Sequence, residues 1–281
     1  MSTNSVLNRN KIIVANDFNE TKDHASLSRH RYGDTQIDIV NPETGELIWR
    51  GHNKIILPGA GFTARSHFDL PRNEITPSYN TALGLENTVI ETPDSLEKVF
   101  LFCVGTDGCG RENSDVFDVN YAKWITPDAL IPFRYVPRNE DLDITLREKY
   151  FGRVLVGNRV AYYFKAFENT PEFVQQYVDG TPISADIYES DKTEEVESYV
   201  DIRLAVTKED CRDWFIQGSS INDARINTIS LCTAWAKYFE ISSGEQVVYY
   251  QDIRPLTKLN IPNEALIDLT KGMDIIYHIY Y

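Results

Sequence analysis

The sequence predicts a mainly β protein that contains an antiparallel β-sandwich and a few short helices. In residues 225–239, β-branched and other apolar side chains alternate between two faces at a period of two, as in a half-buried strand. A Ser-Ser-Gly turn at 242–244 connects this run to a second one at 247–254, so the two should form a hairpin. Aromatic residues make up 12% of the chain, with 16 Tyr and 13 Phe, which also favours sheets and interfaces.

The chain ends in a third strand-like run, residues 273–281. Apolar side chains occupy both faces of this extended segment: Ile275, Ile276, Tyr277, Ile279 and Tyr280. Because so much apolar surface must be covered, we expect this terminus to be a strand inside a sheet or part of an interface.

Other strands are expected earlier in the chain. Residues 35–40 and 46–50 are β-rich and flank a five-residue turn with Pro42 and Gly45, which predicts a hairpin. The runs 97–104 and 158–167 also have strand character.

Residues 198–206 form the clearest amphipathic strand. Their inward face carries apolar side chains only: Val200, Ile202, Leu204 and Val206. The segment 207–210 that follows resembles a capping box and should open a short helix. A second short helix is expected within 139–150, which has acidic residues early and basic residues late.

The chain divides into three expected regions. Residues 1–34 are polar and form an extended arm, which either orders on a neighbouring subunit or is a frayed terminus. Residues 35–150 form an N-terminal β-rich region, and residues 151–281 form a C-terminal β-sandwich-like region. The boundary is placed where the character of the sequence changes, near Phe151.

Composition excludes several classes of function. A formal net charge of -14 argues against nucleic-acid binding, which depends on Lys and Arg. The four cysteines are too few and too scattered for a disulfide framework, so they are expected to be reduced thiols. Neither a signal peptide nor a run of about 18 apolar residues is present, which predicts a soluble protein made in the cytoplasm, with no membrane partner.

The most chemically suggestive loop follows the predicted strand 97–104. Its oxygen-bearing side chains are candidate cation ligands: Asp107, Glu112, Asn113, Asp115 and Asp118. The EF-hand pattern is absent, and the spacing of Cys103 and Cys109 is unusual for zinc. We expect a surface loop that uses Gly and Asp for turns, with no metal or cofactor. A metal-dependent enzyme built on this loop is the alternative.

No motif for nucleophilic or metal-dependent catalysis occurs, so we expect that the protein is not an enzyme. The five histidines are dispersed, and His278 lies among tyrosines, where packing is expected. A distant Asp/Glu pair for glycoside hydrolysis has no sequence signature and stays open as an alternative.

Three stretches carry a family resemblance: residues 47–59, 221–231 and 252–281. Together they resemble uncharacterised virion structural proteins of long-tailed (myovirus-like) bacteriophages. The resemblance implies a neck, tail or baseplate component of the virion, synthesised in the host cytoplasm. Its implied partners are other virion proteins and copies of itself, and it supplies no catalytic residues. The alternative is a carbohydrate-binding or carbohydrate-active β-sandwich that serves host recognition.

Overall fold

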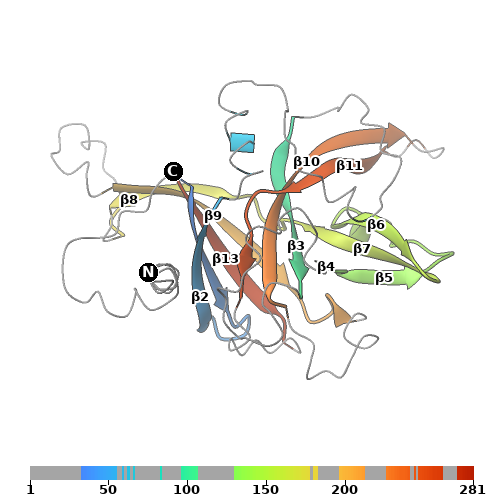
Figure 1. The fold of residues 1–281 in the computed structure, drawn as a ribbon, viewed down its shortest axis with the longest axis horizontal. Coiled ribbons are helices and arrows are strands. Elements are labelled where there is room, and N and C mark those ends of the chain that lie inside the picture. Colours follow the sequence, from blue (N-terminus) through green and yellow to red (C-terminus); the bar gives the residue numbers. More distant parts are fainter. Residues whose placement is uncertain are drawn as a thin grey trace, which may run out of the picture.

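A computed structural model describes residues 33–55, 59, 62–63, 66, 83, 96–106, 130–177, 180–182, 196–212, 226–240, 244, 246–261 and 271–281. These residues form two antiparallel sheets that pack against each other (Figure 1). The predicted mainly β fold with sandwich packing is therefore confirmed. No helix within the described ranges has the length and apolar character needed to cross a membrane.

The first sheet has five strands and is centred on the end of the chain. In spatial order its strands are β2 (Leu47–Lys54), β1 (Asp34–Val40), β13 (Met273–Tyr280), β9 (Val196–Val206) and β8 (Glu172–Tyr177). All neighbours are antiparallel. β13 pairs with β1 on one side and with β9 on the other, so the predicted terminal strand is confirmed as an interior strand of this sheet.

The second sheet has eight strands. Its main path runs through β11 (Gln246–Pro255), β10 (Thr228–Glu240), β3 (Lys98–Gly105), β7 (Arg159–Ala166) and β5 (Arg134–Pro137). Three further strands pair beside this path: β12 (Leu259–Asn260) with β10, β4 (Leu130–Ile131) with β3, and β6 (Tyr150–Val156) with β7. The predicted hairpin of β10 and β11 is confirmed.

The described strands do not segregate at the predicted boundary near residue 151. β1 and β2 share the first sheet with β8, β9 and β13, and β3 shares the second sheet with β7 and β10. Hydrogen bonding between strands far apart in sequence places both halves of the chain in each sheet. The predicted arm, apart from residues 33 and 34, lies outside the described residues.

The two predicted short helices have different outcomes. One turn of helix, α5 (Ile144–Arg147), forms within 139–150 and is N-capped by Asp143, whose carboxylate accepts from the Leu146 N–H. At 207–210 the chain makes a turn, and the Asp210 carboxylate accepts from the Thr207 N–H at 3.0 Å. Arg212 is helical, and the rest of the expected helix, from residue 213 on, lies outside the described residues.

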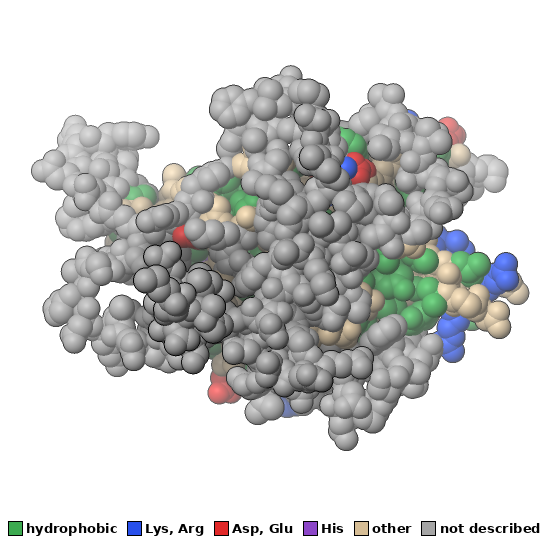
Figure 2. All heavy atoms as spheres, viewed as in Figure 1, with side chains coloured by type: hydrophobic (Ala, Val, Ile, Leu, Met, Phe, Trp, Pro, Cys, Tyr) green, Lys and Arg blue, Asp and Glu red, His purple; other side chains and the backbone are tan. Residues whose placement is uncertain are grey.

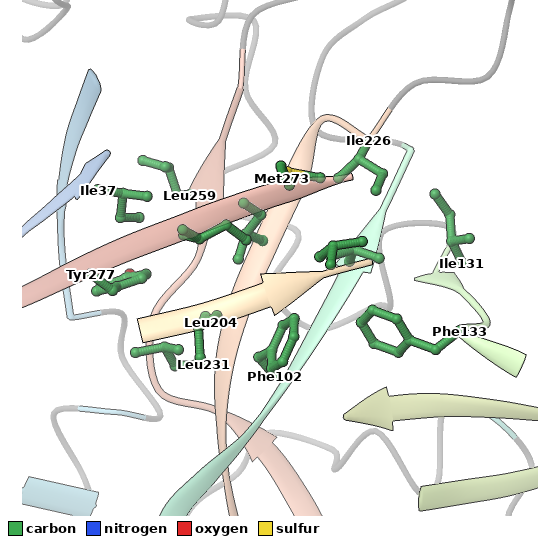
Figure 3. Packing of buried hydrophobic residues seen from close by; sticks show 14 of the residues in the cluster. Ile37, Phe102, Ile131, Phe133, Leu204, Ile226, Leu231, Leu259, Met273 and Tyr277 are labelled. Atoms are coloured by element: carbon green, nitrogen blue, oxygen red, sulfur yellow. The ribbon is translucent and has the colours of Figure 1, made fainter. Parts of the chain in front are cut away.

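The main hydrophobic core lies between the two sheets (Figure 3). From the first sheet it receives Ile37, Leu204 and Tyr277, and from the second it receives Phe102 and Leu231. The alternation predicted for residues 198–206 is confirmed, because Ile202, Leu204 and Val206 are buried in this core while Arg203 is exposed.

The eight-stranded sheet is apolar on both faces. Along β3, Phe102 and Val104 belong to the main core, whereas Leu101 and Cys103 belong to a second cluster with Phe164 and Cys232. A strand buried on both faces has an uninterrupted apolar sequence, which explains the apolar residues 99–104 within the run at 97–104.

Candidate functional site

A buried polar cluster connects the two sheets. Lys165 belongs to β7 of the second sheet, and its side chain is completely buried. Its Nζ donates to the backbone carbonyl of Ala205 in β9 at 2.7 Å and to Asp210 Oδ2 at 3.0 Å. Because β9 belongs to the first sheet, this side chain bridges the sandwich by hydrogen bonds. Glu168 lies 3.0 Å from the same Nζ on the outer side of the cluster.

Asp210 is the acceptor at the centre of this cluster. The Tyr150 hydroxyl donates to Asp210 Oδ1 at 2.7 Å, and the Arg134 guanidinium lies 3.0 Å from the same oxygen. Arg134 also donates to the Tyr150 hydroxyl and stacks over its ring at 4.8 Å. Burial, followed by the neighbouring Asp210 carboxylate, raises the pKa of Tyr150 well above its ordinary value. Tyr150 therefore stays protonated and acts as a hydrogen-bond donor.

The geometry of this cluster is that of a structural tie. The side chains of both Lys165 and Asp210 have no exposed surface, so no substrate reaches their charged atoms. No sequence pattern groups these residues, because they lie on separate segments between positions 134 and 210. Two signals were available: a lysine inside the apolar run 158–167, and the capping-box pattern that ends at Asp210.

A second polar group occupies the outer face of the five-stranded sheet. The strand register places Gln36, His278, Asp201 and Glu172 in one row across β1, β13, β9 and β8. His278 Nε2 lies 3.6 Å from Asp201 Oδ1, and its ring packs against Tyr199 at a centroid distance of 4.4 Å. His278 is therefore packed among aromatic residues, as the sequence predicted. Burial lowers the pKa of His278, in opposition to the nearby carboxylates of Asp201 and Asp38.

The loop that follows β3, which carries the candidate cation ligands, lies outside the described residues. This applies to all of its candidates: Asp107, Cys109, Glu112, Asn113, Asp115 and Asp118. The described ranges contain no group of three or more His, Cys, Asp or Glu side chains arranged to hold a metal ion.

Three cysteines in the described strands and turns are free and buried: Cys103, Cys211 and Cys232. Cys103 Sγ lies 3.8 Å from Cys232 Sγ, in the second apolar cluster. Burial raises the pKa of Cys211 and of Cys232 well above the ordinary thiol value. These two side chains therefore stay protonated and are poor nucleophiles or metal ligands.

The exposed end of β5, β6 and β7 combines apolar and basic side chains, and we call it the basic tip. It consists of Arg138, Arg153, Leu155, Val156 and Arg159. Leu155 is 51% exposed and Val156 is 41% exposed, and the three arginines are exposed beside them. Figure 2 shows hydrophobic and basic side chains gathered at the end of the molecule where Figure 1 places these strands.

Two further ends of the sheets expose large apolar side chains. The end of the β10–β11 hairpin carries Tyr238, Phe239 and Tyr249, all of them exposed. β8, an end strand of the five-stranded sheet, carries Phe173, which is 62% exposed. The sequence indicated a Tyr-rich, interface-forming protein, but only the fold shows which aromatic side chains reach the surface.

Comparisons with known proteins identify no relative for this chain. No protein-family model matches it, and the searches of curated proteins and of solved structures found no significant match.

Proposed function

We propose that the chain is a structural subunit of a tailed bacteriophage virion, located in the neck, tail or baseplate. It acts through contacts with other virion proteins and with copies of itself. The resemblance of residues 47–59, 221–231 and 252–281 to phage virion proteins supports the virion assignment.

The observation that carries an assembly function is the position of the exposed apolar side chains. Leu155, Val156, Phe173, Phe239 and Tyr249 lie at strand ends or on an end strand. Clustered apolar side chains on a surface mark interaction sites, and aromatic residues and arginine are enriched in protein interfaces.

The buried polar cluster around Lys165 and Asp210 suits a virion subunit that must stay rigid under mechanical force. The Lys165–Asp210 pair, together with Tyr150 and Arg134, ties the two sheets at a fixed distance. The Lys165 ammonium and both carboxylate oxygens of Asp210 have partners in this network, and satisfied buried polar groups rigidify a core and favour one arrangement of it.

Purified phage particles test this proposal. We expect the chain among the virion proteins detected by mass spectrometry, and antibody-labelled electron micrographs should locate it in the neck, tail or baseplate. A phage that lacks the protein, supplied with the Phe239→Ser chain, should incorporate less of it than of the Leu47→Ser control. Both residues are exposed, so neither change removes a core contact. Absence of the wild-type chain from purified virions would refute the proposal.

The β10–β11 hairpin favours a second candidate, carbohydrate binding. Lys237 pairs with Tyr249 across the hairpin, so Phe239, two positions further along β10, lies on the same face as Tyr249. Two exposed aromatic rings on one face can stack on sugar rings. Binding of the wild-type chain on a glycan array, lost in the Phe239→Ser variant, would support host recognition in place of a purely structural role.

A further inference from the structure

The basic tip differs in charge from the protein as a whole. The chain has a formal net charge of -14, yet the tip presents Arg138, Arg153 and Arg159 around the β6–β7 turn. Successive residues of a strand point to opposite faces, so Leu155 and Val156 make both faces of the tip apolar. The tip therefore presents exposed apolar side chains surrounded by arginines, an arrangement suited to docking against an acidic surface.

An acidic surface of this kind lies along β8, and we call it the acidic edge. It consists of Glu172, Phe173, Glu197 and Asp201. The register pairs Glu172 with Asp201 and Gln176 with Glu197, so the three carboxylates share one face of the sheet. Arg203 lies on the same face, 3.3 Å from Asp201, and offsets one of these three charges. Phe173 projects from the opposite face and is 62% exposed.

The backbone of β8 is also suited to docking. β8 ends the five-stranded sheet, and among the described residues its outer side makes one isolated bridge, from Gln176 to Pro182. End strands present backbone donors and acceptors that another chain can pair with.

The two surfaces lie at opposite ends of the molecule. In Figure 1, whose horizontal direction is the longest axis, β8 is at one end and the turns of β5, β6 and β7 are at the other. Tip-to-tip contact would bring like charges together, whereas contact between the tip and the acidic edge brings opposite charges together and covers Phe173, Leu155 and Val156.

We infer that the basic tip of one copy docks onto the acidic edge of a second copy, so that chains associate head to tail. The inference rests on the proposed role in assembly and names the two surfaces that would carry self-association. A head-to-tail contact leaves one tip and one edge free in each pair, so it repeats into a closed ring or an open filament. The basic tip offers only a small contact surface, so we expect dissociation constants on the order of micromolar.

Sedimentation velocity of the 281-residue chain tests the inference directly. The wild-type chain should form dimers and larger species as its concentration rises, and fewer of them at high salt, because salt screens exposed charges. The Arg138→Glu/Arg159→Glu variant and the Glu172→Arg variant should each associate at least about tenfold more weakly. Matched controls carry the same charge changes elsewhere: Lys208→Glu/Lys271→Glu for the tip variant and Glu46→Arg for the edge variant. All of these control positions are exposed and should leave association near the wild-type level.

A mixing experiment and a combined variant separate a specific contact from a general charge effect. The tip variant keeps an intact edge and the edge variant keeps an intact tip, so mixing the two should restore the association that each lacks alone. A chain that carries all three changes, Arg138→Glu, Arg159→Glu and Glu172→Arg, reverses charge on both sides of the contact while Arg153, Glu197 and Asp201 stay unchanged, so it should recover part of the association. A purely structural defect would show neither result.

The outcomes also separate this inference from the proposed function. A wild-type chain that stays monomeric at every concentration and salt level, or charge variants that behave as their controls do, would overturn head-to-tail docking. Presence of the chain in purified virions would leave the assembly function standing in that case. Conversely, salt-sensitive association of a chain that is absent from virions would support the contact and refute the virion role.

Discussion

The Asp210→Asn substitution removes the negative charge at the centre of the buried cluster while almost preserving the shape of the side chain. The carbonyl oxygen of the introduced amide can still accept from one donor, but Lys165 then has no carboxylate at 3.0 Å inside the protein. Its remaining contacts are the Ala205 carbonyl at 2.7 Å and Glu168 at the half-exposed edge of the cluster. The fully buried ammonium keeps one of its two carboxylate partners, so part of its desolvation cost is left uncompensated.

The expected decrease in the free energy of unfolding follows from these contacts. Breaking a buried ion pair by removing one partner costs about 3–5 kcal/mol. Glu168 still pairs with Lys165, and the partly exposed Arg134 can move towards solvent. We therefore expect the stability loss of Asp210→Asn near the lower end of this range, at about 3 kcal/mol. Lys165→Met should cost less, because Asp210 keeps both Arg134 and Tyr150 as partners. A loss of this size is a large part of the roughly 5–15 kcal/mol by which a domain is stable.

Urea denaturation followed by fluorescence measures both variants. The midpoint should fall while the slope of the transition stays unchanged, because the folded structure and the surface exposed on unfolding are the same. The matched control is Glu209→Gln, the neighbouring acidic residue, which is exposed and should change stability by less than about 0.5 kcal/mol. An Asp210→Asn variant within about 1 kcal/mol of the control, or a Lys165→Met variant that is the less stable of the two, would refute the reasoning.

Three further changes test other parts of the fold. Deleting β13 removes the central strand of the five-stranded sheet and its buried apolar side chains, each of which stabilises the fold by about 1.5–3 kcal/mol. Near-ultraviolet circular dichroism of the truncated chain should therefore show no fixed tertiary structure. A truncated chain that melts normally would contradict this. Gly152→Ala should destabilise the protein more than Gly157→Ala: both glycines have positive φ (69° and 59°), but an added Cβ collides with the Phe164 ring at the first and meets open space at the second. Equal melting temperatures for these two variants would count against the packing at Phe164. Burial holds the pKa of His278 below its ordinary value of 6.5, so the unfolded chain binds this proton more readily than the folded chain, and stability should fall as the pH drops through that value. In urea denaturation at a series of pH values, the His278→Gln variant should show a smaller fall of the midpoint. A midpoint profile that this substitution leaves unchanged would show that His278 is not the source of the fall.

The sequence by itself determined the fold class and the faces of individual strands. Alternation at a period of two is a local property, so Ile202, Leu204 and Val206 could be assigned to the core before any partner strand was known. Turn chemistry is local as well, which is why the β1–β2 and β10–β11 hairpins were predicted correctly. One turn of helix at α5 was also predictable, from charge placement within 139–150.

Only the tertiary structure decided which distant segments meet. Nothing local specifies that β13 pairs with both β1 and β9, because these strands become neighbours only when the sheet forms. The same holds for the Lys165–Asp210 tie and for the placement of the basic tip and the acidic edge at opposite ends of the molecule. Hydrogen bonds between strands and burial of charge depend on non-local contacts, and a linear sequence carries no period or spacing that encodes them.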